Sequence, residues 1–188
     1  MILLRKVTNK DSRFILSWRN ENQTRLFSRN QNIISQNDHK KWFKNEIKNT
    51  KNILIIAYQK NTRVGFIRYN NVEKNCFEIS INLNPKYRGK GIGSIFLKES
   101  ESFLKYNCVI TAFVKNNNNI SKKIFQKNNY IKLNSHKNII KYIKVHDIKN
   151  YNRSKYYEKI IGEIEKVRKN NNVNWMDLLR LAFDSSPS

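Results

Sequence analysis

The segment between residues 76 and 94 constrains the fold more than any other part of this chain. It reads as a strand, a proline, a glycine-rich turn and a helix in immediate succession. Cys76–Leu83 alternates between apolar and polar side chains, which predicts a half-buried strand that Pro85 ends. The turn that follows reads Arg88-Gly89-Lys90-Gly91-Ile92-Gly93-Ser94. Three closely spaced glycines let the backbone turn tightly and leave its N–H groups exposed where a helix begins.

The chemistry of this turn suits a pyrophosphate group. Exposed N–H groups, the positive end of a helix dipole and the cations of Arg88 and Lys90 all attract an anion. The turn is not an ATP-binding P-loop, because Lys90 is followed by Gly91 instead of Ser or Thr. The glycine spacing also differs from that of dinucleotide-binding folds. We therefore expect a phosphate-bearing ligand of another kind.

Apolar periodicity in the rest of the chain predicts a mixed sheet. We expect strands at 1–7, 53–58, 62–69, 76–83, 108–114, 130–133 and 139–145, and helices at 11–18, 36–48, 91–106 and 118–127. One strand–helix–strand unit lets the fourth and fifth strands lie parallel. The predicted fold class is α/β (α+β), with a mostly antiparallel sheet of six or seven strands and helices on both faces.

A chain of 188 residues fits one domain with a small appendage. We assign the main domain to residues 1–146 and a C-terminal helical hairpin to residues 147–188, where apolar residues recur at helical spacing. Exposed Trp175 and Leu178 there would suit a homodimer or a pathway partner. The final Ser-Ser-Pro-Ser resembles a helix start, so we expect a truncated chain.

The charge of the chain is strongly positive, with 37 basic and 14 acidic residues and a net charge of +23. Because the basic residues are spread over the whole chain, we do not expect nucleic-acid binding to be the main function. A non-catalytic module that binds RNA through its charge remains an alternative. We expect no membrane contact and a cytoplasmic location, because no apolar run approaches the roughly 20 residues of a membrane span and the N-terminus lacks a signal peptide. Two cysteines and no cluster with ligand spacing predict no metal.

The pattern Arg88-x-x-Gly91-x-Gly93 resembles the acetyl-CoA signature of the GNAT superfamily of N-acetyltransferases, and the matching order of elements extends from residue 1 to about 146. The resemblance implies that backbone amides from Arg88 to Ser94 hold the pyrophosphate of acetyl-CoA. It also implies that the fourth and fifth strands splay apart to admit the pantetheine. An N–H near Ile81 or Leu83 could then hold the thioester carbonyl.

The segment from Val114 to Tyr130 resembles the second CoA-binding segment of the family. This implies cofactor contacts from Asn118 and Ser121. Phe125 stands where the family often has a tyrosine as general acid, and a phenylalanine cannot donate a proton. Tyr130 and Tyr87 are the nearest substitutes in the sequence.

Acetyl transfer to an amine also needs a proton acceptor. Glu78 is the first candidate, because it lies on the face of its strand opposite the apolar set, shortly before the glycine-rich turn. His39 is a competing candidate on the helix that carries Trp42.

The acceptor side of the sequence carries a second resemblance. Arg19, Asn20, Arg25 and the pair of His39 and Trp42 resemble a pattern in GNAT members that act on nucleotide-linked amino sugars. Arginines, which here include Arg29, suit a diphosphate, and Trp42 could stack on a base or a sugar. The resemblance implies acetylation of a UDP-linked 4-amino-4,6-dideoxy sugar, as in pseudaminic acid biosynthesis. The alternative acceptor is the N-terminal amine of a protein, such as a ribosomal protein.

Overall fold

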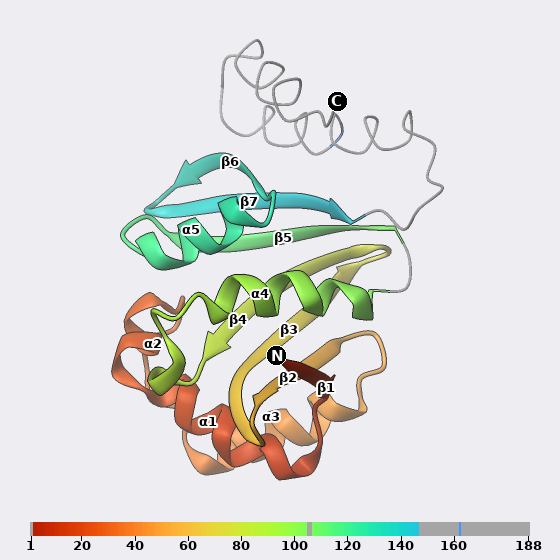
Figure 1. Ribbon diagram of the computed structural model, residues 1–188, viewed down its shortest axis with the longest axis vertical. Coiled ribbons are helices and arrows are strands. Elements are labelled where there is room, and N and C mark those ends of the chain that lie inside the picture. The colour runs from red at the N-terminus through yellow and green to blue at the C-terminus, as the bar shows by residue number, and fades with distance from the viewer. Residues whose placement is uncertain (1, 105–106, 147–161, 163–188) are drawn as a thin grey trace.

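Seven strands form one sheet in the computed structural model, which describes residues 2–104, 107–146 and 162. The order across the sheet is β1-β2-β3-β4-β5-β7-β6 (Figure 1). The strands are β1 (Leu3–Lys6), β2 (Ile53–Gln59), β3 (Thr62–Glu73), β4 (Cys76–Leu83), β5 (Cys108–Lys115), β6 (Ile131–His136) and β7 (Ile139–His146). Among the described strands, β4 and β5 pair in parallel and every other pair is antiparallel. The predicted fold class is confirmed.

Helices cover both faces of the sheet. They are α1 (Ser12–Asn20), α2 (Asn22–Phe27), α3 (Gln36–Lys48), α4 (Ile92–Ser100) and α5 (Asn119–Lys127). On one face, Trp18 of α1 and Phe43 of α3 pack with Phe66 of β3 in a small core. On the other face, Phe96 of α4 and Phe125 of α5 belong to a larger core that includes most of the buried strand residues.

Three elements differ from the sequence prediction. The short helix α2 was not predicted, because its residues show no apolar stripe. Glu21 caps it by accepting hydrogen bonds from the backbone N–H groups of Gln23 and Thr24. Helix α4 ends at Ser100 instead of near residue 106, and a 3₁₀ turn over Glu101–Phe103 follows it. Strand β3 continues to Glu73 because its last residues still pair with β4.

Strands β4 and β5 separate soon after they meet, as Figure 1 shows. Their register contains only Cys76 with Val109, Phe77 with Ile110 and Glu78 with Thr111, although β4 continues to Leu83 and β5 to Lys115. The predicted splay is therefore present, and it begins directly after Glu78.

The C-terminal helical hairpin predicted for residues 147–188, with Trp175 and Leu178, lies outside the described residues apart from residue 162. In the part of the chain that the structure does describe, no helix is both long and apolar enough to cross a membrane.

Candidate active site

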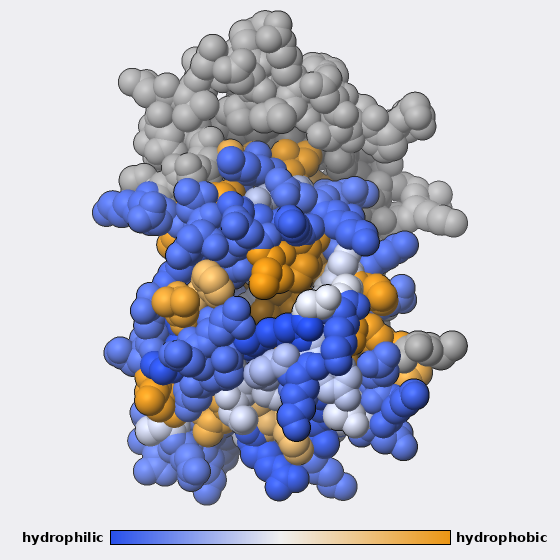
Figure 2. Space-filling model, turned by 60° about the vertical axis from the view of Figure 1, so that its left-hand side comes forward, coloured by the Kyte–Doolittle hydropathy of each residue, from blue (hydrophilic) through white to orange (hydrophobic). Residues whose placement is uncertain are grey.

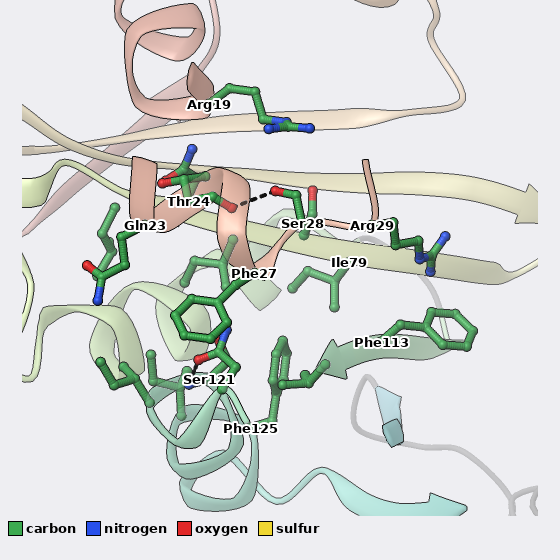
Figure 3. Close-up of a pocket in the computed structure, with 18 of the residues that line it drawn as sticks. Arg19, Gln23, Thr24, Phe27, Ser28, Arg29, Ile79, Phe113, Ser121 and Phe125 are labelled. Atoms are coloured by element: carbon green, nitrogen blue, oxygen red, sulfur yellow. Dashed lines mark hydrogen bonds between the residues drawn. The ribbon is translucent and has the colours of Figure 1, made fainter. Parts of the chain in front are cut away.

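The splay between β4 and β5 opens into a cavity of about 380 Å³. Figure 3 shows Arg19 and Thr24 on one side of this cavity and Ser121 and Phe125 on the other. Residues 78–83 of β4 and Phe113 and Val114 of β5 line it between these sides. In Figure 2 an apolar surface lies in a hollow that hydrophilic side chains surround. We call this hollow the wedge cavity; it offers an apolar passage into the sheet.

Backbone donors of β4 face the wedge cavity. The N–H of Asn84 donates to the carbonyl oxygen of Val64 on β3 at 3.0 Å, and the register places Leu83 beside Gly65 and Ile81 beside Ile67. Because N–H groups alternate between the two sides of a strand, those of Ile81 and Leu83 point away from β3, into the gap where β5 no longer pairs with β4. They are fixed dipoles that can hold a developing negative charge on an oxygen.

The glycine-rich loop has a backbone that only glycine adopts easily. Gly89 and Gly91 both have a φ of +74°, in the left-handed region, and Gly91 is the N-cap of α4. A Cβ atom at either position would meet nothing within 4 Å, so the loop borders open space. This geometry fits a ligand that bears a pyrophosphate, at the amino end of α4.

The remaining residues at the start of α4 position the loop by packing. A Cβ on Gly93 would lie 2.8 Å from Cδ1 of Ile124 on α5. Ser94 accepts a hydrogen bond on Oγ from Nδ2 of Asn128 at 2.9 Å, and Ile92 is buried. Any cofactor contact of these three α4 residues would therefore use the main chain, as the sequence analysis expected.

The side chain of Arg88 does not extend over the loop as a free cation. Its Nη1 donates to Glu21 Oε2 at 2.8 Å and to Gln23 Oε1 at 2.8 Å. Its Nη2 donates to Thr24 Oγ1 at 2.7 Å and to the carbonyl oxygen of Leu83 at 3.3 Å. Arg88 thus attaches α2 to the end of β4, and the charge that the sequence analysis assigned to phosphate is paired with Glu21.

Lys90 is exposed, and its Nζ lies 5.4 Å from the ring centre of Tyr87. On α5, Asn118 Oδ1 accepts from the N–H of Ser121 at 3.0 Å and caps the helix. Asn118, Ser121 and Phe125 all line the wedge cavity, in agreement with their assignment to the cofactor side.

Glu78 lines the wedge cavity where the strands part, and an arginine holds it. Its Oε1 lies 3.0 Å from Nη2 of Arg29. The guanidinium of Arg29 also lies over the ring of Phe113, with Cζ 4.5 Å from the ring centre. Glu78 is the carboxylate among the described residues that line the wedge cavity.

The other two predicted catalytic residues lie outside the lining of the wedge cavity, but His39 borders a neighbouring cavity together with Trp42. Tyr130 is buried, and its hydroxyl donates to Glu101 at 3.5 Å outside the lining of the wedge cavity. His39 Nε2 lies 3.0 Å from the carbonyl oxygen of Ser12 and 3.1 Å from the hydroxyl oxygen of the same residue. Burial lowers the pKa of His39, although the bond to Ser12 opposes this. The buried hydroxyl of Tyr130 therefore does not reach the wedge cavity, which corrects that prediction, whereas the catalytic role of His39 stays a prediction.

No tyrosine, Tyr87 included, belongs to the described lining of the wedge cavity. The hydroxyl groups available there come from Thr24, Ser28, Ser80 and Ser121. Sequence reasoning missed Thr24 and Ser28 because it missed α2. Ser80 could have been found, because it shares the polar face of β4 with Glu78.

A second cavity of about 420 Å³ adjoins the wedge cavity on the side of α1 and α3. Arg19, Thr24, Ser28 and residues 80–82 of β4 line both. Trp42 and Arg68 border the second cavity, and Cζ of Arg68 lies 5.8 Å from the Trp42 ring. This second cavity, which we call the acceptor cavity, reaches β4 where the wedge opens.

Arg19 stands out among the predicted acceptor residues. Its Nη2 donates to the carbonyl oxygen of Asn30 at 2.6 Å, but its buried Nη1 has no hydrogen-bond partner among the described residues. Burial and the nearby charge of Arg25 lower the pKa of Arg19, and no ion pair among the described residues joins it to a carboxylate.

Two other residues that were predicted to contact the acceptor substrate support the segment between α2 and α3 instead. Asn20 exchanges hydrogen bonds with the backbone of Ile34, at 2.8 and 2.9 Å. Arg25 donates to the carbonyl oxygens of Asn20 and Gln31, each at 3.1 Å. Neither residue lines a described cavity, so their expected contact with the acceptor is replaced by a role in shaping the segment between α2 and α3.

A splayed sheet, inward N–H donors and a glycine-rich anion loop at the start of α4 define a transferase that takes its acyl group from a CoA thioester. The chain belongs to the acetyltransferase (GNAT) family, which matches residues 14–130. It is therefore an N-acetyltransferase that uses acetyl-CoA.

Solved structures share the fold at low identity. Spermidine N-acetyltransferase from Vibrio cholerae, in complex with CoA and spermine, is 13% identical with a TM-score of 0.67, over 77% of this chain and 95% of that chain. Ribosomal-protein-alanine N-acetyltransferase from Brucella melitensis is 17% identical with a TM-score of 0.64, over 77% and 99%. Campylobacter jejuni N-acetyltransferase PseH, in complex with acetyl coenzyme A, is 17% identical with a TM-score of 0.59, over 78% and 100%. The comparison with curated proteins returns no match.

Proposed function

We propose that the acceptor is the amine of a nucleotide-linked amino sugar, of the UDP-4-amino-4,6-dideoxy type used in pseudaminic acid biosynthesis. The observation that carries this proposal is Arg19, whose side chain lines both cavities and whose buried Nη1 has no hydrogen-bond partner among the described residues. A guanidinium in this state suits a phosphate or another anion. The cytoplasmic location expected from the sequence is part of the proposal.

The pairing of the lining arginines favours an anionic group beside Arg19, although the carboxylate of Asp38 also lines the acceptor cavity. Among the lining cations, Arg29 is paired with Glu78, Arg88 with Glu21, and Arg68 with Glu46 at 3.7 Å. Arg19 has no such carboxylate partner among the described ion pairs. A polyamine would add positive charge beside it, whereas a diphosphate would compensate it. The half-buried ring of Trp42 adds a surface for a base or a sugar.

Each group of this site has a role in the proposed reaction. Bound acetyl-CoA supplies the acetyl group. The loop from Arg88 to Ser94 holds its pyrophosphate through main-chain N–H groups, and the N–H groups of Ile81 and Leu83 hold the oxygen that becomes negative. The Glu78 carboxylate accepts the proton of the attacking amine, directly or through a water molecule, as the C–N bond forms. The C–S bond of the thioester then breaks, and CoA leaves as a thiolate that takes a proton from water.

The test compares acceptors by the release of free CoA thiol. The protein is incubated with acetyl-CoA and the UDP-linked 4-amino sugar, spermidine, or a peptide with a free N-terminus. We expect the amino sugar alone to be acetylated efficiently. We expect Arg19→Gln to raise the KM of that acceptor on the order of tenfold and to leave the KM of acetyl-CoA unchanged.

The matched control is Lys98→Gln, which removes one exposed positive charge from α4, far from the described cavity linings. It should behave as the wild type. Acetylation of the peptide but not of the sugar would replace this proposal by a protein acceptor. Acetylation of spermidine alone would contradict the electrostatic argument.

A further inference from the structure

Arg29 lies between α2 and α3, and its guanidinium contacts both strands where they part. On β4 it is paired with Glu78 at 3.0 Å, and on β5 it lies over the ring of Phe113 at 4.5 Å. Glu78 is also the last β4 residue in register with β5. The carboxylate that would accept the amine proton is therefore already bound to a cation at the mouth of the wedge cavity.

This ion pair is open to exchange with a ligand. The side chain of Arg29 is 56% exposed and that of Glu78 is 28% exposed. Ion pairs this open to water contribute little to stability, because solvent screens the attraction. A phosphate can bind a guanidinium through two parallel charge-assisted hydrogen bonds. The contact with Phe113 can keep the guanidinium in place while its anionic partner changes.

We propose that the anionic group of the acceptor displaces the Glu78 carboxylate from its ion pair with Arg29. The phosphate of the acceptor takes the guanidinium, and the Glu78 carboxylate becomes free to receive the proton of the acceptor amine. This inference rests on the proposed function insofar as the acceptor carries an anion near its amine. Arg29 is then a positioning residue that determines specificity, because an amine without an anion leaves Glu78 paired.

If the acceptor displaces Glu78, substitution of Glu78 and substitution of Arg29 should change the affinity for anions in opposite directions. If Glu78 competes with the ligand for Arg29, then removing its charge strengthens anion binding, whereas removing Arg29 weakens it. An ion pair that only maintains the shape of the cavity would give weaker binding in both variants. The sign of the Glu78 effect therefore separates exchange from a purely structural ion pair. The double variant Glu78→Gln/Arg29→Gln separates exchange from the general effect of a lost negative charge, because exchange predicts that Glu78→Gln adds nothing once Arg29 is absent.

The experiment measures anion binding by calorimetry on the full chain saturated with CoA, so that the cofactor loop is already filled. UDP and inorganic pyrophosphate are titrated separately into the wild type, Glu78→Gln, Arg29→Gln, the double variant and the control Lys98→Gln. We expect Glu78→Gln to bind both anions roughly threefold more tightly and Arg29→Gln to bind them on the order of tenfold more weakly. Lys98→Gln should match the wild type.

Each outcome decides the question. Binding by Glu78→Gln that is no tighter than wild-type binding overturns the exchange, as does unchanged binding by Arg29→Gln. If pyrophosphate shows the expected pattern but UDP does not bind, the exchange stands and the nucleotide-linked acceptor is wrong. If neither anion binds to the wild type or to Glu78→Gln, both proposals are wrong.

Discussion

Gly91 is the N-cap of α4 and Gly93 lies in its first turn, but the structure requires the two glycines for different reasons. Gly91 has a φ of +74°, so any other residue would be strained there, although a side chain would point into open space. Gly93 is limited by space, because its Cβ would lie 2.8 Å from Ile124 Cδ1. The first glycine is needed for backbone conformation and the second for the close approach of α4 to α5.

This difference predicts which substitution a second change can rescue. Gly93→Ala should reduce the free energy of unfolding by about 1 kcal/mol through overpacking, and Ile124→Val, which removes the crowding methyl group, should restore part of it. Gly91→Ala should lose about 1–2 kcal/mol to backbone strain. Ile124→Val should not rescue that loss. Urea unfolding of the single and double variants measures both couplings. Equal rescue of the two alanine variants would contradict the assignment.

Sequence reasoning could identify this loop but not all the partners of its side chains. The glycine spacing and the following helix are local properties, so they predicted the anion site. The partner of Arg88 is Glu21, which is 67 residues away in the sequence. A contact at such separation depends on the folded sheet, and no local pattern signals it. The same reason explains why Tyr130 was placed at the site, when burial beside Glu101 holds its hydroxyl elsewhere.

At the scale of secondary structure, α2 depends on elements distant in sequence. A six-residue helix such as α2 is barely stable in isolation, because helix nucleation costs free energy and the few hydrogen bonds that follow do not offset it. Here Glu21 caps α2 and also receives the guanidinium of Arg88 from the loop before α4. The acceptor side of the site, which includes Thr24 and Ser28, is therefore attached to the cofactor loop. The missing local signal is why the sequence predicted two helices before β2 instead of three.

The salt bridge between Glu21 and Arg88, which attaches α2 to the loop before α4, should weaken at low pH. Burial alone would raise the pKa of Glu21, but hydrogen bonds from Gln23, Arg88 and Thr24 outweigh it and lower the pKa from 4.5 to about 2. A carboxyl with a depressed folded-state pKa stabilises the protein above its unfolded pKa and loses that contribution as pH falls through the folded value. The stabilisation from Glu21 should therefore be complete above about pH 4.5 and decline toward about pH 2.

Unfolding of wild type and Glu21→Gln by urea at several pH values measures this dependence. The stability difference between them should be largest above pH 4.5 and should shrink below it. Glu99→Gln, an exposed change on α4, is the control and should show no such difference. A gap between wild type and Glu21→Gln that stays constant down to pH 2 would show that the contact with Arg88 does not depend on the charge of Glu21.

At the scale of the whole molecule, the sheet consists of two parts that diverge. Strands β1 to β4 form one part and β5, β7 and β6 the other, joined along the ladder by only the short register at Cys76 to Glu78. Helices α4 and α5 join them again through Gly93 with Ile124 and Ser94 with Asn128. The overall order of strands could be predicted, because apolar alternation is a property of each segment. The side chains at the opening could be predicted only in part: Glu78 and Ser121 follow from local patterns, but Thr24 and Ser28 do not, since the lining comes from five helices and strands and the loops between them.

Binding of acetyl-CoA should protect particular backbone amides from hydrogen exchange, and this architecture predicts which ones. The N–H groups of Ile81 and Leu83 point into the splay, whereas that of Asn84 already donates to Val64. In the free protein we expect fast exchange at the first two positions and slow exchange at Asn84. Saturation with CoA should slow Ile81 and Leu83 by excluding water. Acetyl-CoA should slow one of them further, because its carbonyl oxygen accepts a hydrogen bond there. Slow exchange of Ile81 and Leu83 without any ligand would mean that the wedge is closed in solution, and the acyl-transfer geometry derived from these two donors would then be wrong.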